Sequence, residues 1–85
     1  MNEKTTLAAL PKSVRARIIG FSADTEDQET RFREIGFAEG DIIEILHVGV
    51  FGKSPINVKL HGTSIAMRPR QAAMINIELL NESVS

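Results

Sequence analysis

Two histidines and a nearby glutamate are the side chains of this sequence best suited to binding a metal ion. His47, His61 and Glu44 offer imidazole and carboxylate groups, which are common ligands of zinc and iron. They lack the helical i, i+4 spacing of a metal motif, so only the pairing of strands could bring them together. A single histidine in a strand is more often structural or partly exposed than a ligand. We therefore expect no resident metal or other cofactor, with His47 and His61 as the candidates for a site.

Catalytic motifs are lacking. No serine stands in a nucleophile elbow, and the absence of cysteine excludes both a thiol nucleophile and a disulfide framework. Residues 49–54, Gly-Val-Phe-Gly-Lys-Ser, end like a phosphate-binding Walker loop, but that loop needs a glycine where His47 stands. The acidic pair Glu26 and Asp27 falls at a predicted helix start, where the helix dipole favours carboxylates. The sequence therefore predicts a protein that is not an enzyme.

A glycine-bracketed segment at residues 49–55 is the best candidate for contact with a partner. We interpret it as a loop with Phe51 at its tip, where the ring is either tucked under the loop or exposed. An aromatic anchor beside a basic residue is typical of docking surfaces. Phe51, Gly52 and Lys53 are accordingly the predicted partner-binding residues.

The 85 residues make one small domain, with an expected core over about 5–79 and a flexible tail at 80–85. No apolar run approaches the roughly 20 residues needed to span a bilayer, and the N-terminus lacks the pattern of a signal peptide. We therefore expect a cytoplasmic protein that is not embedded in a membrane. The sequence leaves a weak homo-oligomer open.

Charge is unevenly distributed along the chain. Eight of the eleven acidic residues fall between Asp24 and Glu44, whereas residues 45–77 contain four cations and no acid. Four cations are few for nucleic acid, since a specific nucleic-acid module usually makes about six or more phosphate contacts. We expect a slightly polarised surface, or a charged face that docks a protein, and no nucleic-acid partner.

The pattern of apolar residues predicts a mainly β fold. A short helix that ends near Ile35 is expected after the first strand. Ser22, Asp24 or Thr25 could cap it, and Thr25 with Gln28 fits a capping box. A helical turn is expected at 69–73, before the last strand. Strands of this length, joined by hairpin-like turns at about 10-residue spacing, favour a small barrel. The five predicted strands are 15–21, 41–48, 56–60, 63–68 and 74–79.

Several residues are expected to define the fold. Gly36 would close the helix in a left-handed conformation, and Phe37 would pack back on its last turn. Gly40 lies in the next reversal, and His61 with Gly62 has the form of a two-residue hairpin turn. These positions would turn a covering helix into a core strand and join two later strands.

Three segments resemble the FeoA family, the small partner of the bacterial ferrous-iron transporter FeoB. Residues 31–40, RFREIGFAEG, look like the signature R-R-L-x-x-[LM]-G-[LF]-x-x-G. Residues 52–58, GKSPINV, are similar to the family segment G-[DS]-P-[IL]-x-[VI] and make Pro55 a further fold-defining position. Residues 62–68, GTSIAMR, followed by 75–77, INI, resemble the family's closing strands. The likeness covers about residues 5–79.

The sequence departs from the family pattern at a few positions. Ser13 stands where a glycine often precedes the first strand, and Phe32 replaces the usual second arginine. Lys53 and Ser54 replace an acidic residue before the proline, which changes the charge of that segment.

The resemblance implies an SH3-like barrel with inserted helices and a non-enzymatic role. It implies that the protein binds the cytoplasmic GTP-binding region of FeoB and modulates ferrous iron uptake. Two alternatives stay open at this point. One is a metal-binding or metal-sensing SH3-like domain that uses His47 and His61, and the other is a generic SH3-like module for protein interaction.

Overall fold

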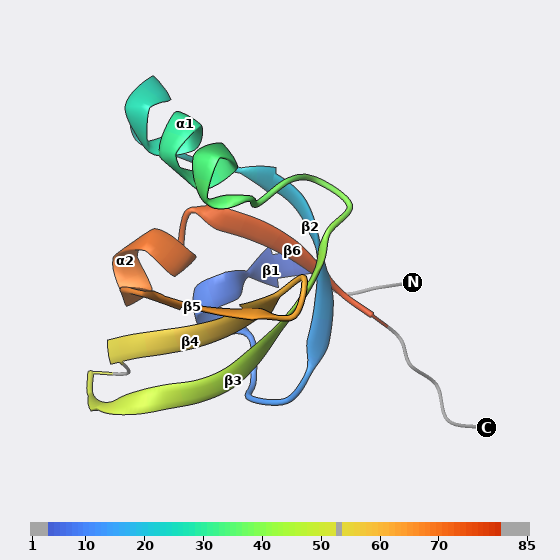
Figure 1. The fold of residues 1–85 in the computed structure, drawn as a ribbon, viewed down its shortest axis with the longest axis vertical. Coiled ribbons are helices and arrows are strands. Elements are labelled where there is room, and N and C mark those ends of the chain that lie inside the picture. Colours follow the sequence, from blue (N-terminus) through green and yellow to red (C-terminus); the bar gives the residue numbers. More distant parts are fainter. Residues whose placement is uncertain (1–3, 53, 81–85) are drawn as a thin grey trace.

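The computed structural model describes residues 4–52 and 54–80, apart from the side chain of Phe51, and places six strands in one antiparallel sheet (Figure 1). The strand order is β1-β6-β2-β3-β4-β5, so the last strand lies between the first two. The elements are β1 (Lys4–Thr6), the 3-10 helix η1 (Leu7–Ala9), β2 (Arg15–Phe21), α1 (Glu26–Ile35), β3 (Ile42–Phe51), β4 (Ser54–Leu60), β5 (Thr63–Met67), α2 (Pro69–Ala72) and β6 (Ile75–Leu79).

The prediction of a mainly β fold, with a helix after the first long strand and a helical turn before the last, is confirmed. The sheet has six strands where the sequence predicted about five, because β1 is only three residues long and shows no apolar alternation. It is recognisable only from its pairing with β6, in which Thr5 lies opposite Ile77. Beyond the sheet, Leu80 donates a hydrogen bond to the Arg15 carbonyl (3.2 Å), and residues 81–85 of the predicted tail lie outside the described residues.

The core lies between the curled sheet and the short helical segments. Alternating residues of the long strands, such as Ile43 and Ile45 of β3, point inward, as period-2 burial requires. Leu7 of η1, Ala72 of α2 and Met74 pack against the same cluster. Among the described residues, no polar or charged residue is buried as a whole. In the same part of the chain, neither helix is long and apolar enough to cross a bilayer.

Helix α1 is fixed by its two ends and by one aromatic contact. The Thr25 hydroxyl accepts a hydrogen bond from the Gln28 amide (3.2 Å), which satisfies one amide of the first turn. Gly36 follows the last turn with a φ of 122°, and its amide donates to the Phe32 and Arg33 carbonyls. Phe32 is the single fully buried side chain of α1. Its ring stacks on Phe21 of β2 (centroids 5.7 Å apart) and meets the edge of Phe37 (6.2 Å).

The prediction of a loop over residues 49–55 was wrong, because β3 and β4 run through this segment as a long hairpin (Figure 1). Phe51 and Ser54 are still paired across the two strands. Gly49 permits this pairing: a Cβ at that position would overlap the backbone carbonyl of Ser54. The glycines therefore mark a close approach of two backbones and a tight turn.

Candidate functional site

The end of the β3–β4 hairpin carries the predicted partner-binding residues. Gly52 is exposed in the turn with a φ of 60°, whereas Lys53 and the side chain of Phe51 lie outside the described part of the structure. The sequence analysis missed Val50, whose side chain is 87% exposed next to the turn. Val50 fell within the segment predicted as a loop, where its residue type does not show whether the side chain is covered or exposed; its place near the end of the hairpin exposes it. The hairpin therefore presents an apolar side chain to solvent on a two-stranded support.

The two candidate metal ligands lie at different places on the sheet. His47 is exposed in the middle of β3, opposite Asn57, and His61 lies in the turn between β4 and β5. The β3 residue next to that turn is Ile43, which pairs with Leu60. Four strand residues, or about 13 Å, therefore separate the two histidine positions. This arrangement does not bring them to one ion, and the described residues contain no cluster of three or more potential metal ligands.

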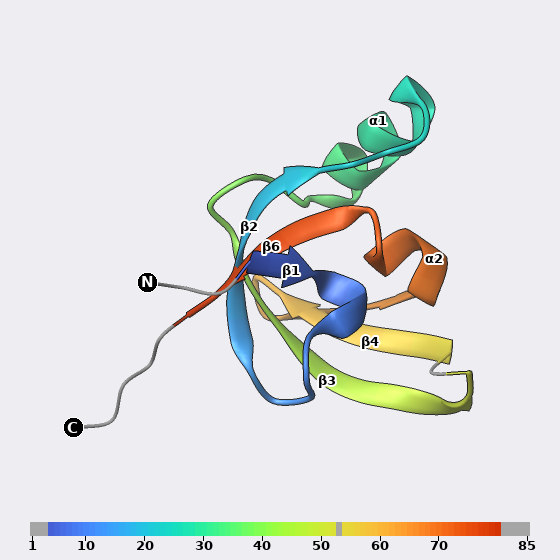
Figure 2. The same ribbon diagram turned by 180° about the vertical axis from the view of Figure 1, so that it is seen from behind.

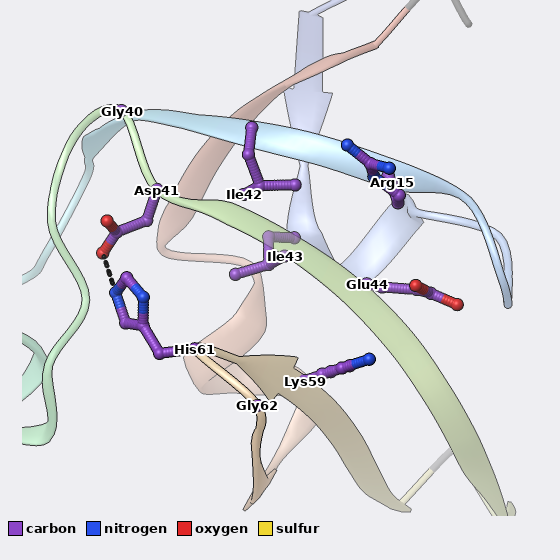
Figure 3. Close-up of a pocket in the computed structure, with 9 residues that line it drawn as sticks. All are labelled: Arg15, Gly40, Asp41, Ile42, Ile43, Glu44, Lys59, His61 and Gly62. Atoms are coloured by element: carbon purple, nitrogen blue, oxygen red, sulfur yellow. Dashed lines mark ion pairs between the residues drawn. The ribbon is translucent and has the colours of Figure 1, made fainter.

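His61 instead interacts with the segment that precedes β3 (Figure 3). Its Nε2 lies 3.3 Å from Oδ2 of Asp41, so the two form an ion pair when the imidazole is protonated. The same Asp41 oxygen accepts a hydrogen bond from the Ala38 amide (3.0 Å). His61 (φ 51°) and Gly62 (φ 79°) form the two-residue turn itself. Asp41 thus links the reversal after α1 to the turn between β4 and β5.

A shallow pocket of about 510 Å³ lies beside this pair, over β2, β3 and the β4–β5 turn (Figure 3). Its floor carries a row of alternating charge, because Arg15 pairs with Glu44 across β2 and β3, and Glu44 with Lys59 across β3 and β4. Opposite charges on neighbouring strands stabilise a sheet modestly. The imidazole that lines the pocket belongs to His61 and is already paired with Asp41. We therefore assign the pocket a structural role.

Arg33 of α1 interacts with two carboxylates. Its guanidinium donates hydrogen bonds to both oxygens of Glu39 (3.0 and 3.1 Å) and to Glu29 (3.2 Å). Hydrogen bonding from Arg33 holds the pKa of Glu39 below its usual value. The guanidinium also lies over the Phe21 ring, 5.0 Å from its centroid. Arg33 therefore ties the end of α1 to the loop after it and to β2.

Comparison with known proteins identifies the family of this fold. The model of the FeoA domain matches residues 5–79. The chain belongs to the FeoA family. A search of curated proteins gave no match. Members of the FeoA family are non-enzymatic accessory proteins implicated in ferrous iron transport.

Solved structures of FeoA proteins resemble this one over most of the chain. Iron(II) transport protein A from Clostridium thermocellum is 31% identical with a TM-score of 0.79; the alignment covers 91% of this chain and 46% of that protein, so this chain spans about half its length. An FeoA-like protein from Clostridium acetobutylicum has 22% identity and a TM-score of 0.83, with coverage of 100% and 96%. FeoA from Stenotrophomonas maltophilia, a prokaryotic SH3 domain protein complexed with zinc, has 25% identity and a TM-score of 0.76, with coverage of 86% and 88%.

These relatives confirm the resemblance drawn from the sequence motifs, the SH3-like fold and the non-enzymatic class. The motif residues have structural places in this FeoA chain. Gly36 and Gly40 (φ 95°) adopt left-handed conformations on either side of buried Phe37. Pro55 is the second residue of β4, next to the hairpin turn, and Gly62 completes the turn to β5.

Proposed function

We propose that this FeoA protein binds the cytoplasmic GTP-binding region of a FeoB-type ferrous iron transporter and modulates ferrous iron uptake. The observation that supports the proposal is the match to the FeoA domain over residues 5–79, almost the whole chain. A small domain without a catalytic constellation in its described residues suits an accessory role, in which the protein works by contact. The proposed place of action is the cytoplasm.

We place the docking surface at the end of the β3–β4 hairpin, on Val50, Phe51, Gly52 and Lys53. Val50 is the most exposed large apolar side chain in the described part of the chain, at 87%. Burying such a side chain contributes favourable free energy, and an adjacent aromatic residue is a common interface anchor. Pairing of Phe51 with Ser54 continues the two strands up to the turn, so Val50 is presented from a paired backbone. The complementary partner surface would hold an apolar pocket with an acidic rim.

The decisive experiment measures binding of this protein to the purified GTP-binding region of its transporter. Phe51→Ala and Val50→Ser should each weaken binding by about tenfold or more, as truncation of an interface anchor does. Leu46→Ser is the matched control, because Leu46 is also an exposed apolar residue of β3 (38%) but lies away from the turn. Thermal unfolding of every variant verifies that the fold is kept. Full binding by a folded Phe51→Ala, Val50→Ser double variant would remove the hairpin from the interface.

The cellular role needs a separate measurement. Deleting the gene under iron limitation should change ferrous iron uptake, and the wild-type protein should restore it better than the double variant does. Unchanged uptake after deletion would contradict a role in transport, whatever the binding experiment gives.

A further inference from the structure

A cavity of about 560 Å³ between α1 and α2 is lined by three arginines and two glutamines. Both helices lie on the same flank of the molecule in the ribbon views, with α1 above α2 (Figures 1 and 2). Gln28 and Arg31 come from one face of α1, three residues apart. Arg68 precedes α2, and Arg70 and Gln71 belong to it. No acidic residue is among the residues that line the cavity.

These three arginines differ from Arg17 and Arg33 in making no ion pair within the described part of the chain. Arg33 binds Glu29 and Glu39, and Arg17 lies 3.6 Å from Glu78. Arg31, Arg68 and Arg70 make no ion pair with any residue that the structure describes. Three guanidinium groups around one cavity repel one another. An anion bound between them would attract all three and offset that repulsion.

The two glutamines add polar groups that suit a polar ligand. The Gln28 side-chain oxygen is buried and has no hydrogen-bond partner within the described chain. A buried acceptor is normally satisfied, and a small rotation of the Gln28 side chain toward the cavity would let a ligand hydroxyl or a protonated ligand oxygen supply the missing donor. The side-chain oxygen of Gln71 accepts a hydrogen bond from the backbone amide of Arg68 (2.9 Å). This bond fixes the orientation of the Gln71 side chain and stabilises the start of α2.

We propose that this cavity binds a phosphate group, carried by a soluble phosphate ester or by a lipid headgroup. A carboxylate is satisfied by one guanidinium, whereas a phosphate offers three or more oxygens in a tetrahedral arrangement that several guanidinium groups can contact together. The volume is within the range of about 300–1,000 Å³ typical of small-molecule sites, and leaves room for the group esterified to the phosphate. The proposal rests on these side chains and does not depend on the transporter partner.

Two acids on the same helix moderate the expected affinity. Asp27 and Glu34 lie four residues before and three after Arg31, close enough to lower the positive potential at the mouth of the cavity. We therefore expect dissociation constants in the range of about 10 μM to 1 mM, which calorimetry measures readily.

The test uses calorimetry with pyrophosphate, and co-sedimentation with vesicles of phosphatidylcholine alone or with added phosphatidic acid. Arg31→Gln, Arg68→Gln and Arg70→Gln should each weaken binding by about tenfold, the loss typical of a charge-assisted hydrogen bond. Arg17→Gln, which removes the same charge from β2, is the matched control and should bind like wild type. Thermal unfolding checks that all four variants fold.

The two arms distinguish the source of the phosphate. Binding of pyrophosphate without preference for acidic vesicles assigns the site to a soluble ester, and preference for phosphatidic acid that the three variants lose assigns it to a headgroup. Binding in neither arm up to about 10 mM pyrophosphate, or equal weakening by Arg17→Gln, would overturn the proposal.

Discussion

The guanidinium of Arg33 donates a hydrogen bond to each carboxylate oxygen of Glu39, at 3.0 and 3.1 Å, and the two residues lie on either side of the glycine that ends α1. The two-pronged contact closes the chain reversal between the helix and β3, because the partners lie on either side of Gly36. Glu29 joins from the preceding helical turn. A reversal fixed in this way keeps Phe37 over the Phe32 ring, so the charged contact outside supports the aromatic contact inside.

Glu39 should make stability fall in acid. Its folded-state pKa lies below the ordinary value of 4.5, chiefly because Arg33 hydrogen-bonds the carboxylate, so the unfolded chain binds a proton more readily. This contribution is fully present above the unfolded pKa and is lost as pH falls through the folded pKa. Urea unfolding between about pH 6 and pH 3 should show that loss in wild type and a smaller one in Glu39→Gln.

Glu34→Gln is the control, since Glu34 forms no ion pair within the described chain. It should keep the acid-induced loss of wild type. Equal profiles for Glu39→Gln and wild type would show that the Arg33 contact contributes nothing to folding in solution. High salt should also reduce the difference, because both side chains are exposed.

Gly49 should not tolerate a side chain. A Cβ there would overlap the Ser54 carbonyl, so Gly49→Ala forces the two strands of the hairpin apart and should cost about 1–3 kcal/mol of unfolding free energy. Gly20→Ala is the matched control in β2, because nothing lies within 4 Å of its added Cβ and its φ is not positive. Gly20→Ala should stay within about 0.5 kcal/mol of wild type. Similar losses for the two variants in denaturant unfolding would contradict the close approach.

Ser13 occupies a position better suited to glycine. Its φ is 68°, a left-handed conformation that costs an L-residue about 1–2 kcal/mol, while its amide donates to the Ile45 carbonyl (2.9 Å). Ser13→Gly should raise the unfolding free energy by about 0.5–1 kcal/mol, after the larger entropy of glycine in the unfolded chain is subtracted. Ser64→Gly, in β5 where φ is not positive, should lower it by a similar amount. A loss of stability in Ser13→Gly would refute the assignment of strain.

Local signals in the sequence predicted the elements whose causes are local. The cap at Thr25, the glycine stop at Gly36 and the turn at His61–Gly62 depend on residues within a few positions of each other. Strand β1 was not predicted because its one strand partner within the described chain is β6, some seventy residues later. The hairpin was predicted as a loop because a glycine such as Gly49 commonly interrupts a strand. The reason for a glycine at this position is the nearby Ser54 carbonyl, and only the pairing of β3 with β4 brings that carbonyl close.

Some site features could likewise be predicted from neighbouring residues, and others depend on contacts between distant parts of the chain. The motif of residues 31–40 identified the family, since it is a continuous string. The cavity between α1 and α2 could not be read from the sequence, because Arg31 and Arg68 are 37 positions apart and only the fold places them together. The exposure of Val50 likewise follows from how far the hairpin extends past the core.

The position of β6 between β1 and β2 bears on how this domain is made. Strands β2, β3, β4 and β5 follow one another both in the chain and in the sheet, so they can pair before the rest of the chain has been synthesised. Strand β1, by contrast, has no sheet partner until the chain has emerged as far as β6. A chain that ends before Ile75 would therefore hold the four paired strands β2 to β5 with β1 unpaired, and the arrival of β6 would join β1 to β2.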